Sequence, residues 1–183
     1  MMKKAIIFVL ILLFSSVSVS AQWIALYADY ERSATSVQGV GVDDIVTVFL
    51  FVQPTALGIE CIELNSFTYG DGVYAIDDIE YHPESYLVTG GFPNSDLVGC
   101  WYDCHYDWTY YCAATLVLQS DVPFCINIRG IQGPPSQPVP RGLECMEDWF
   151  PYVPQCNFCV NQLSQCEVAV GESSWGAIKS LYE

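Results

Sequence analysis

Apolar and polar residues alternate with a period of two along most of this chain, and this pattern restricts the fold more than any other feature. Successive side chains of a β-strand point to opposite faces, so such alternation predicts strands. Short strands separated by Gly, Pro and Asp turns, with no convincing internal helix, are typical of an antiparallel β-sandwich. The predicted strands cover residues 23–28, 45–53, 59–64, 73–79, 86–88, 111–119 and 125–131.

The first 21 residues have the layout of a secretion signal. Lys3 and Lys4 form a cationic start, residues 5–14 are apolar, and the small residues of 15–21 precede an expected cleavage before Gln22. Ten apolar residues are fewer than the about 20 that span a bilayer. We therefore expect a mature chain without a membrane span. Its predicted location is the extracellular space or cell surface, with the periplasm as an alternative.

The chain is strongly acidic, with 21 Asp and Glu residues against 6 Lys and Arg residues and a formal net charge of −15. Loss of the signal removes two lysines and takes this charge to −17. Nucleic acids and anionic lipids require clustered Lys and Arg, so the composition argues against both as partners. With 52% hydrophobic residues, the chain has enough apolar surface for one sizeable core.

We expect one β-sandwich domain over residues 22–170, followed by a tail over 171–183. Within the domain, residues 133–142 contain four prolines and form a stiff connection, and 143–170 form a Cys-rich final segment. The tail changes to a helical period, which predicts a short helix with one apolar face. That face either docks on the domain or is a handle recognised in export, surface attachment or assembly. Its residues are Trp175, Ile178, Leu181 and Tyr182.

All nine cysteines follow the signal. Outside the cytoplasm cysteines usually pair, so nine of them predict four disulfides and one leftover thiol. The pairing stays open, because even eight cysteines allow 105 schemes. The cysteines are Cys61, Cys100, Cys104, Cys112, Cys125, Cys145, Cys156, Cys159 and Cys166.

Residues 100–112 are the densest candidate site, with three cysteines, one histidine and six aromatic residues. We interpret them as a long hairpin loop held by a disulfide within the set Cys100, Cys104 and Cys112. Two weaker alternatives are a zinc site formed by these cysteines with His105, and covalent haem on the Cys-x-x-x-Cys-His run, which is one residue longer than the usual motif.

The aromatic residues of the same segment are candidates for an exposed binding platform. Flat rings bury a large area at low entropic cost, which suits a sugar or a partner protein. The alternative is that they are ordinary core and cross-strand residues. They are Trp101, Tyr102, Tyr106, Trp108, Tyr110 and Tyr111.

Both ends of the mature chain resemble a largely uncharacterised group of small secreted bacterial proteins. The matching residues are Ile24 to Asp29 at the start, and Gln165 to Val170 with Ser174 to Tyr182 at the end. The resemblance implies a signal peptide, one Cys-bearing β-sandwich of the cohesin or immunoglobulin-like kind, and a Trp-Gly-x-x-Lys-x-Leu-Tyr tail. No activity, cofactor or catalytic residue comes with it.

Enzyme signatures such as Gly-x-Ser-x-Gly, His-Glu-x-x-His and the phosphate-binding glycine loop do not occur in the sequence. We therefore expect no catalytic residues and no cofactor. The leading hypothesis is a secreted structural or adhesive extracellular protein that acts without catalysis and is able to self-assemble. The first alternative is a carbohydrate- or protein-binding module that uses residues 100–112, and the second is a metal- or haem-bearing redox protein.

Overall fold

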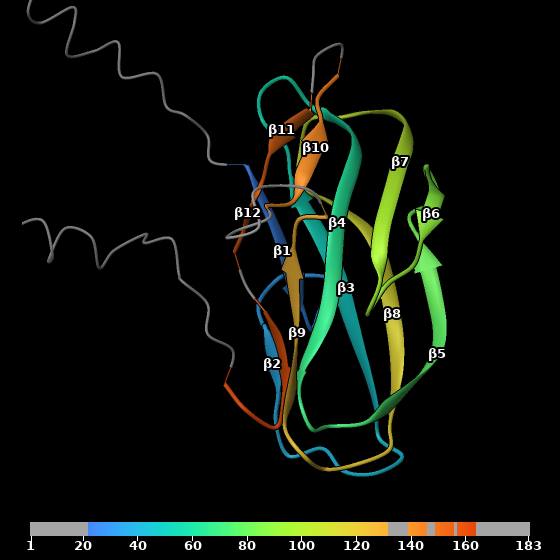
Figure 1. The fold of residues 1–183 in the computed structure, drawn as a ribbon, viewed down its shortest axis with the longest axis vertical. Helices are drawn as coiled ribbons and strands as arrows, with labels where there is room; N and C mark the ends of the chain where they lie inside the picture. The colour runs from blue at the N-terminus through green and yellow to red at the C-terminus, as the bar shows by residue number, and fades with distance from the viewer. Residues whose placement is uncertain (1–21, 132–138, 146–148, 156, 164–183) are drawn as a thin grey trace, which may run out of the picture.

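A computed structural model describes residues 22–131, 139–145, 149–155 and 157–163, which form thirteen strands (Figure 1). The strands are β1 (Trp23–Tyr27), β2 (Ser36–Val37), β3 (Ile45–Gln53), β4 (Ile59–Gly70), β5 (Tyr74–Tyr81), β6 (Ser85–Gly90), β7 (Asp96–His105), β8 (Thr109–Leu118), β9 (Phe124–Arg129), β10 (Arg141–Leu143), β11 (Trp149–Pro151), β12 (Val153–Pro154) and β13 (Phe158–Val160).

The strands form two sheets. The five-stranded sheet has the order β12-β1-β3-β8-β5. The eight-stranded sheet has the order β11-β10-β4-β9-β13-β2, and β7 adds to it by pairing with β4 and with β6. The longest strands run along the long axis of the molecule, and β5 is followed directly by β6 at one side (Figure 1). The chain therefore passes from the first sheet to the second between β5 and β6.

The core lies between the inner faces of the two sheets. In β3, Val46, Val48 and Leu50 are buried and alternate with outward residues, as the period of two predicts. The eight-stranded sheet adds an equally apolar inner face. Fully buried residues of that face include Ile62, Leu64, Leu97, Trp101, Phe124, Ile126 and Phe158.

Two expectations about the elements are corrected. The predicted fold class included a short C-terminal helix, but the described residues contain strands and no helix; the tail at 171–183 lies outside them. No helix of the described part is long and apolar enough to cross a membrane. The Pro-rich connection was expected to exclude regular structure through residue 142, yet β10 begins at Arg141 because its backbone pairs with Glu63 of β4.

Three disulfides join described cysteines: Cys61–Cys100, Cys104–Cys145 and Cys125–Cys159. The first and third connect residues directly opposite each other on neighbouring strands, with Cα atoms 3.9 and 4.1 Å apart. Cys112 is free and buried. The expected bridge within Cys100, Cys104 and Cys112 is therefore wrong, because each of these residues lies on a strand that faces other partners. Cys156 and Cys166 lie outside the described residues, so the fourth disulfide stays a prediction.

Candidate functional site

Residues 100–112 are not one hairpin loop. They comprise the end of β7 in the eight-stranded sheet, a connection over 106–108, and the start of β8 in the five-stranded sheet. This segment therefore crosses from one sheet to the other, and its side chains separate into different environments.

The zinc and haem alternatives are ruled out because the cysteines that they require are disulfide-bonded or buried. Cys100 and Cys104 are bonded to Cys61 and Cys145, so neither is free to bind zinc or attach haem. Cys112 is buried in the core on β8. Of the four predicted zinc ligands, only His105 lies in a group that could hold a metal.

The six aromatic residues of this segment do not form one platform. Trp101 and Tyr111 are fully buried in the core, where their rings pack edge to face at a centroid distance of 5.3 Å. The Tyr111 hydroxyl donates a hydrogen bond to the Tyr86 carbonyl oxygen at 2.9 Å. The remaining four residues are partly or largely exposed, namely Tyr102, Tyr106, Trp108 and Tyr110.

Two of these four, Trp108 and Tyr110, belong to a larger group that covers the outer face of the five-stranded sheet. Tyr110 packs against Tyr30, Phe49 and Phe51 at centroid distances of 5.5, 6.5 and 6.2 Å. Most of these ring pairs meet edge to face. We call this group the aromatic face; it comprises Tyr27, Tyr30, Phe49, Phe51, Trp108 and Tyr110.

The loop between β1 and β2 supplies the outermost ring and a cation. Its shape depends on the Asp29 carboxylate, which accepts hydrogen bonds from the Ser33 amide and hydroxyl at 2.9 Å and from the Ala34 amide at 2.8 Å. The hydrogen bond from the Ser33 amide is the main reason why the pKa of Asp29 is lowered. The loop places Arg32 over Trp108, with its guanidinium carbon 4.9 Å from the ring centroid, and leaves Tyr30 59% exposed.

Sequence reasoning did not find the aromatic face as a unit. The strand over 45–53 was expected to be apolar on both faces, and Phe49 and Phe51 alternate with the core residues Val48 and Leu50, although Phe51 is buried beneath the neighbouring rings. Outward aromatic residues on a central strand were thus the available signal. What the sequence does not contain is the fold of the β1–β2 loop, which brings Tyr30 onto the same face.

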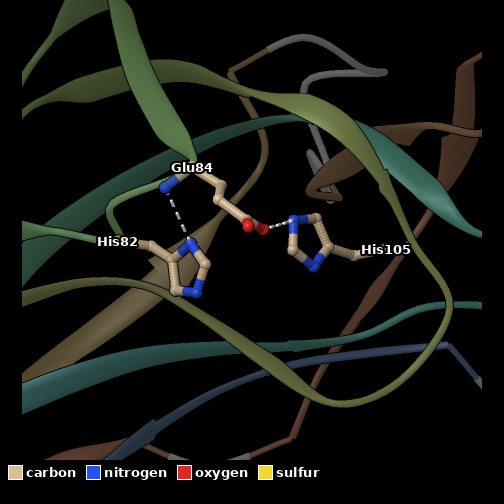
Figure 2. Close-up of side chains that lie close together, drawn as sticks. All are labelled: His82, Glu84 and His105. Carbon is tan, nitrogen blue, oxygen red and sulfur yellow. Dashed lines mark hydrogen bonds and ion pairs between the residues drawn. The ribbon is translucent and has the colours of Figure 1, made fainter.

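A second group adjoins the aromatic face through His82, whose ring lies 5.0 Å from that of Tyr110. His82 and Glu84 come from the turn between β5 and β6, and His105 is the last residue of β7. Figure 2 shows the Glu84 carboxylate directed toward the His105 imidazole, and the His82 ring lies close by, with its centroid 5.4 Å from that of His105. Glu84 Oε2 lies 3.5 Å from His105 Nε2, and the Glu84 amide donates a hydrogen bond to His82 Nδ1 at 3.2 Å. We call these three residues the histidine cluster.

Burial and the nearby His82 ring lower the pKa of His105, against the smaller opposing effect of Glu84 and Asp103. Neutral imidazole is therefore favoured near neutral pH, and neutral imidazole is the form that has a free lone pair. Sequence reasoning assigned no acidic partner to His82. The signal was His82-Pro83-Glu84, which places both side chains on one tight turn.

No protein-family model matches the chain, and no curated protein matches it. Similar solved structures are cohesin modules. The sixth cohesin of scaffoldin B from Acetivibrio cellulolyticus, solved with a Cel5 dockerin mutant, has a TM-score of 0.54 and 9% identity, covering 78% of this chain and 99% of that one. A cohesin module of a family 33 glycoside hydrolase from Clostridium perfringens has a TM-score of 0.53 and 6% identity, covering 77% and 97%. The OlpA cohesin of a type I cohesin–dockerin complex from Clostridium thermocellum has a TM-score of 0.52 and 8% identity, covering 77% and 98%.

These similarities define the class of fold: the chain forms a cohesin-like β-sandwich. The predicted all-β sandwich is confirmed, and with it the part of the family resemblance that concerned fold. At identities below 10% the likeness extends to the fold alone.

Proposed function

We propose that this protein is a secreted, non-catalytic module that binds another protein through the aromatic face. The observation that carries the proposal is the aromatic face on the outside of the five-stranded sheet, where Tyr30 is largely exposed and Arg32 lies over Trp108, while Phe51 supports the group from beneath. Aromatic residues and arginine are the residue types most enriched at the energetic centres of protein interfaces. Two of the similar cohesins were solved in complexes with dockerins, which supports a protein as the partner.

Ring geometry favours a protein over a glycan. Sugars stack on the flat face of an exposed ring, whereas Tyr30, Phe49 and Tyr110 pack mainly edge to face against one another. This arrangement leaves a rough apolar surface with a cation at its border, which suits the varied side chains of a protein. The platform predicted over 100–112 for a carbohydrate or a protein also included Trp101 and Tyr111, both of which are buried. A second copy of this chain is one possible partner, in line with the structural or adhesive hypothesis.

Secretion is part of the proposal. Its support is the signal-like start of the sequence and the three disulfides among the described residues, because disulfides persist in oxidising compartments. The acidic composition also suits an exported protein that must stay soluble.

Site-specific photo-crosslinking tests the proposal. A photoreactive phenylalanine derivative replaces Tyr30 in one variant and Tyr69 in a control, because Tyr69 is also exposed but lies on β4 of the other sheet. Both variants are produced in the cells that secrete the protein, and cross-linked species are identified by mass spectrometry. We expect one discrete protein adduct at position 30 and none at position 69. The purified partner should then bind Tyr30→Ala at least about tenfold more weakly than wild type, which corresponds to about 1.4 kcal/mol.

Two results would contradict the proposal. One is the absence of any adduct at position 30 from secreted, folded protein. The other is a partner whose affinity is the same for Tyr30→Ala, Tyr69→Ala and wild type. If the adduct is a second copy of the chain, sedimentation analysis should show a dimer that Tyr30→Ala weakens, which supports the assembling form of the proposal.

A further inference from the structure

The histidine cluster brings together three ligand groups from segments that are distant in sequence. One nitrogen of each imidazole and one carboxylate oxygen of Glu84 all lie within 4.8 Å of one another. This is the only group of three such residues within the described ranges. Two nitrogens and one oxygen are the donor set that Zn²⁺ and the neighbouring transition metals prefer, whereas Ca²⁺ and Mg²⁺ prefer oxygen ligands alone.

The turn that supplies His82 and Glu84 is fixed to both sheets. The His82 carbonyl accepts the Ser85 amide at 2.8 Å, which closes a turn with Pro83 at its second position, where proline is favoured. The His82 amide donates to the Tyr111 carbonyl of β8 at 2.9 Å, and the Glu84 carbonyl accepts the Tyr102 amide of β7 at 2.8 Å. The backbone is therefore anchored on either side of the two ligands before any ion arrives.

The third residue of the cluster, His105, is fixed at the end of β7 by a neighbouring disulfide and by ring packing. Its neighbour Cys104 is bonded to Cys145, and its ring packs against Trp101 at a centroid distance of 5.5 Å. The His105 side chain is only 17% exposed. Its Nε2 atom is buried and makes no hydrogen bond, although Glu84 lies 3.5 Å away. A buried polar atom without a partner costs free energy, and a bound cation would relieve that cost.

We propose that the histidine cluster binds one divalent transition-metal ion of the Zn²⁺ type. Ligand atoms of a tetrahedral zinc site with bonds of about 2.1 Å are roughly 3.4 Å apart, so distances of up to 4.8 Å within the cluster have to shorten by up to about 1.4 Å. The Glu84 side chain is 59% exposed and free to make that adjustment. The hydrogen bond that His82 Nδ1 accepts from the Glu84 amide is given up on metal binding, because ligation needs either the Nδ1 lone pair itself or a proton moved onto Nδ1 to free Nε2. Three protein ligands leave a fourth position for water or for a side chain of another protein.

Metal titration of the mature protein tests the proposal. The protein is prepared without a polyhistidine tag and freed of metal, and Zn²⁺ binding is measured by calorimetry in a buffer that does not chelate. We expect one Zn²⁺ per chain, with at least tenfold weaker binding of Ca²⁺ and Mg²⁺. Co²⁺ should bind at the same position and give the intense visible absorption of a tetrahedral or five-coordinate site.

Variants distinguish Zn²⁺ binding at the histidine cluster from non-specific binding to the acidic surface. His82→Gln, Glu84→Gln and His105→Gln should each weaken Zn²⁺ binding at least tenfold, whereas the control Asp121→Asn, an exposed carboxylate, should leave it unchanged. Circular dichroism confirms folding. If His105→Gln does not fold, the variants at His82 and Glu84 on the turn between β5 and β6 decide the question. Failure of wild type to bind Zn²⁺, equal binding of Ca²⁺, or binding that none of the three variants weakens would overturn the proposal. It does not rest on the proposed protein-binding role of the aromatic face.

Discussion

Cys112 lies within β8 with its thiol in the core, and it is unpaired among the described cysteines. Burial raises the pKa of this thiol, because the thiolate would lose its hydration in an apolar environment. Thiolates are the reactive form of cysteine, so a buried neutral thiol is chemically inert in the folded protein.

We expect a maleimide to label no thiol of the native protein near neutral pH. After unfolding without reductant it should label one thiol per chain, because the sequence predicts four disulfides among nine cysteines. Mass spectrometry counts the labels, and Cys112→Ala should remove the one that appears. Labelling of native protein would contradict the buried position, and more than one label after unfolding would contradict the fourth disulfide.

At the scale of the residue, the alternation of apolar and polar side chains predicted burial in β8 correctly, except at a β-bulge in its pairing with β3. The sequence placed Cys112, Ala114, Leu116 and Leu118 on one face of a strand, and all four are buried there. Tyr111 is buried as well, beside Cys112. The register between β3 and β8 shifts at this point, pairing Leu50 with Cys112 and Phe51 with Tyr110. Two consecutive side chains thereby turn inward, and a period of two does not contain that information.

Among the long strands, β7 was the one that sequence reasoning missed, and the short strands β2 and β10 to β13 were missed as well. The ten residues of β7 include Trp101, Cys104 and His105, whose chemical variety favoured a functional loop over a strand. The pairing of Cys61 with Cys100 and of Leu64 with Leu97 depends on β4, which lies more than thirty residues earlier in the chain. The histidine cluster was missed for the same reason, since only the pairing of β7 in the second sheet brings His105 to the turn at 82–84.

The Cys104–Cys145 disulfide connects the end of β7 to the residues that follow the short strand β10. β10 has three residues, and its pairing with β4 is correspondingly weak. We expect the double variant Cys104→Ala/Cys145→Ala to lower the free energy of unfolding by about 2–4 kcal/mol, because the bridge closes a loop with a sequence separation of 41.

Urea denaturation followed by fluorescence measures this loss. The double variant Cys61→Ala/Cys100→Ala is a suitable comparison, because its bridge has a similar separation of 39 but joins neighbouring strands that are already paired over many residues. An unchanged unfolding free energy in the first variant would show that the Cys104–Cys145 bridge does not hold β10 in place.

At the scale of the whole molecule, acidic side chains far outnumber basic ones. The three arginines of the described residues each lie over an aromatic ring, and only Arg141 also forms an ion pair, with Glu63. Most carboxylates of the described residues therefore form no ion pair with an arginine. The composition alone predicted this excess, whereas the stacking of the arginines on aromatic rings follows from the fold.

Self-repulsion of the carboxylates should make thermal stability depend on salt. Raising NaCl from about 0.01 M to 0.15 M shortens the screening length from about 30 Å to 8 Å. We expect the Tm to rise by about 2–4 °C for each kcal/mol of repulsion that is relieved. Calorimetry at constant pH measures the change, with sucrose at equal osmolality as a control for solvent effects. A Tm that stays constant or falls would mean that the acidic groups do not repel one another appreciably.

The parallel pairings of β1 with β12 and of β2 with β13 join the first strands of the chain to the last described ones. Ile24 lies opposite Pro154, and Ser36 lies opposite Cys159. A ribosome therefore has to release almost the whole described chain before either early strand gains this partner. Until then β1 presents unpaired backbone groups along one side, and such an edge recruits strands of other molecules. For β1 the aggregation-prone interval therefore lasts until residues 153–155 have emerged, and a chaperone that shields β1 until that moment should raise the yield of folded protein.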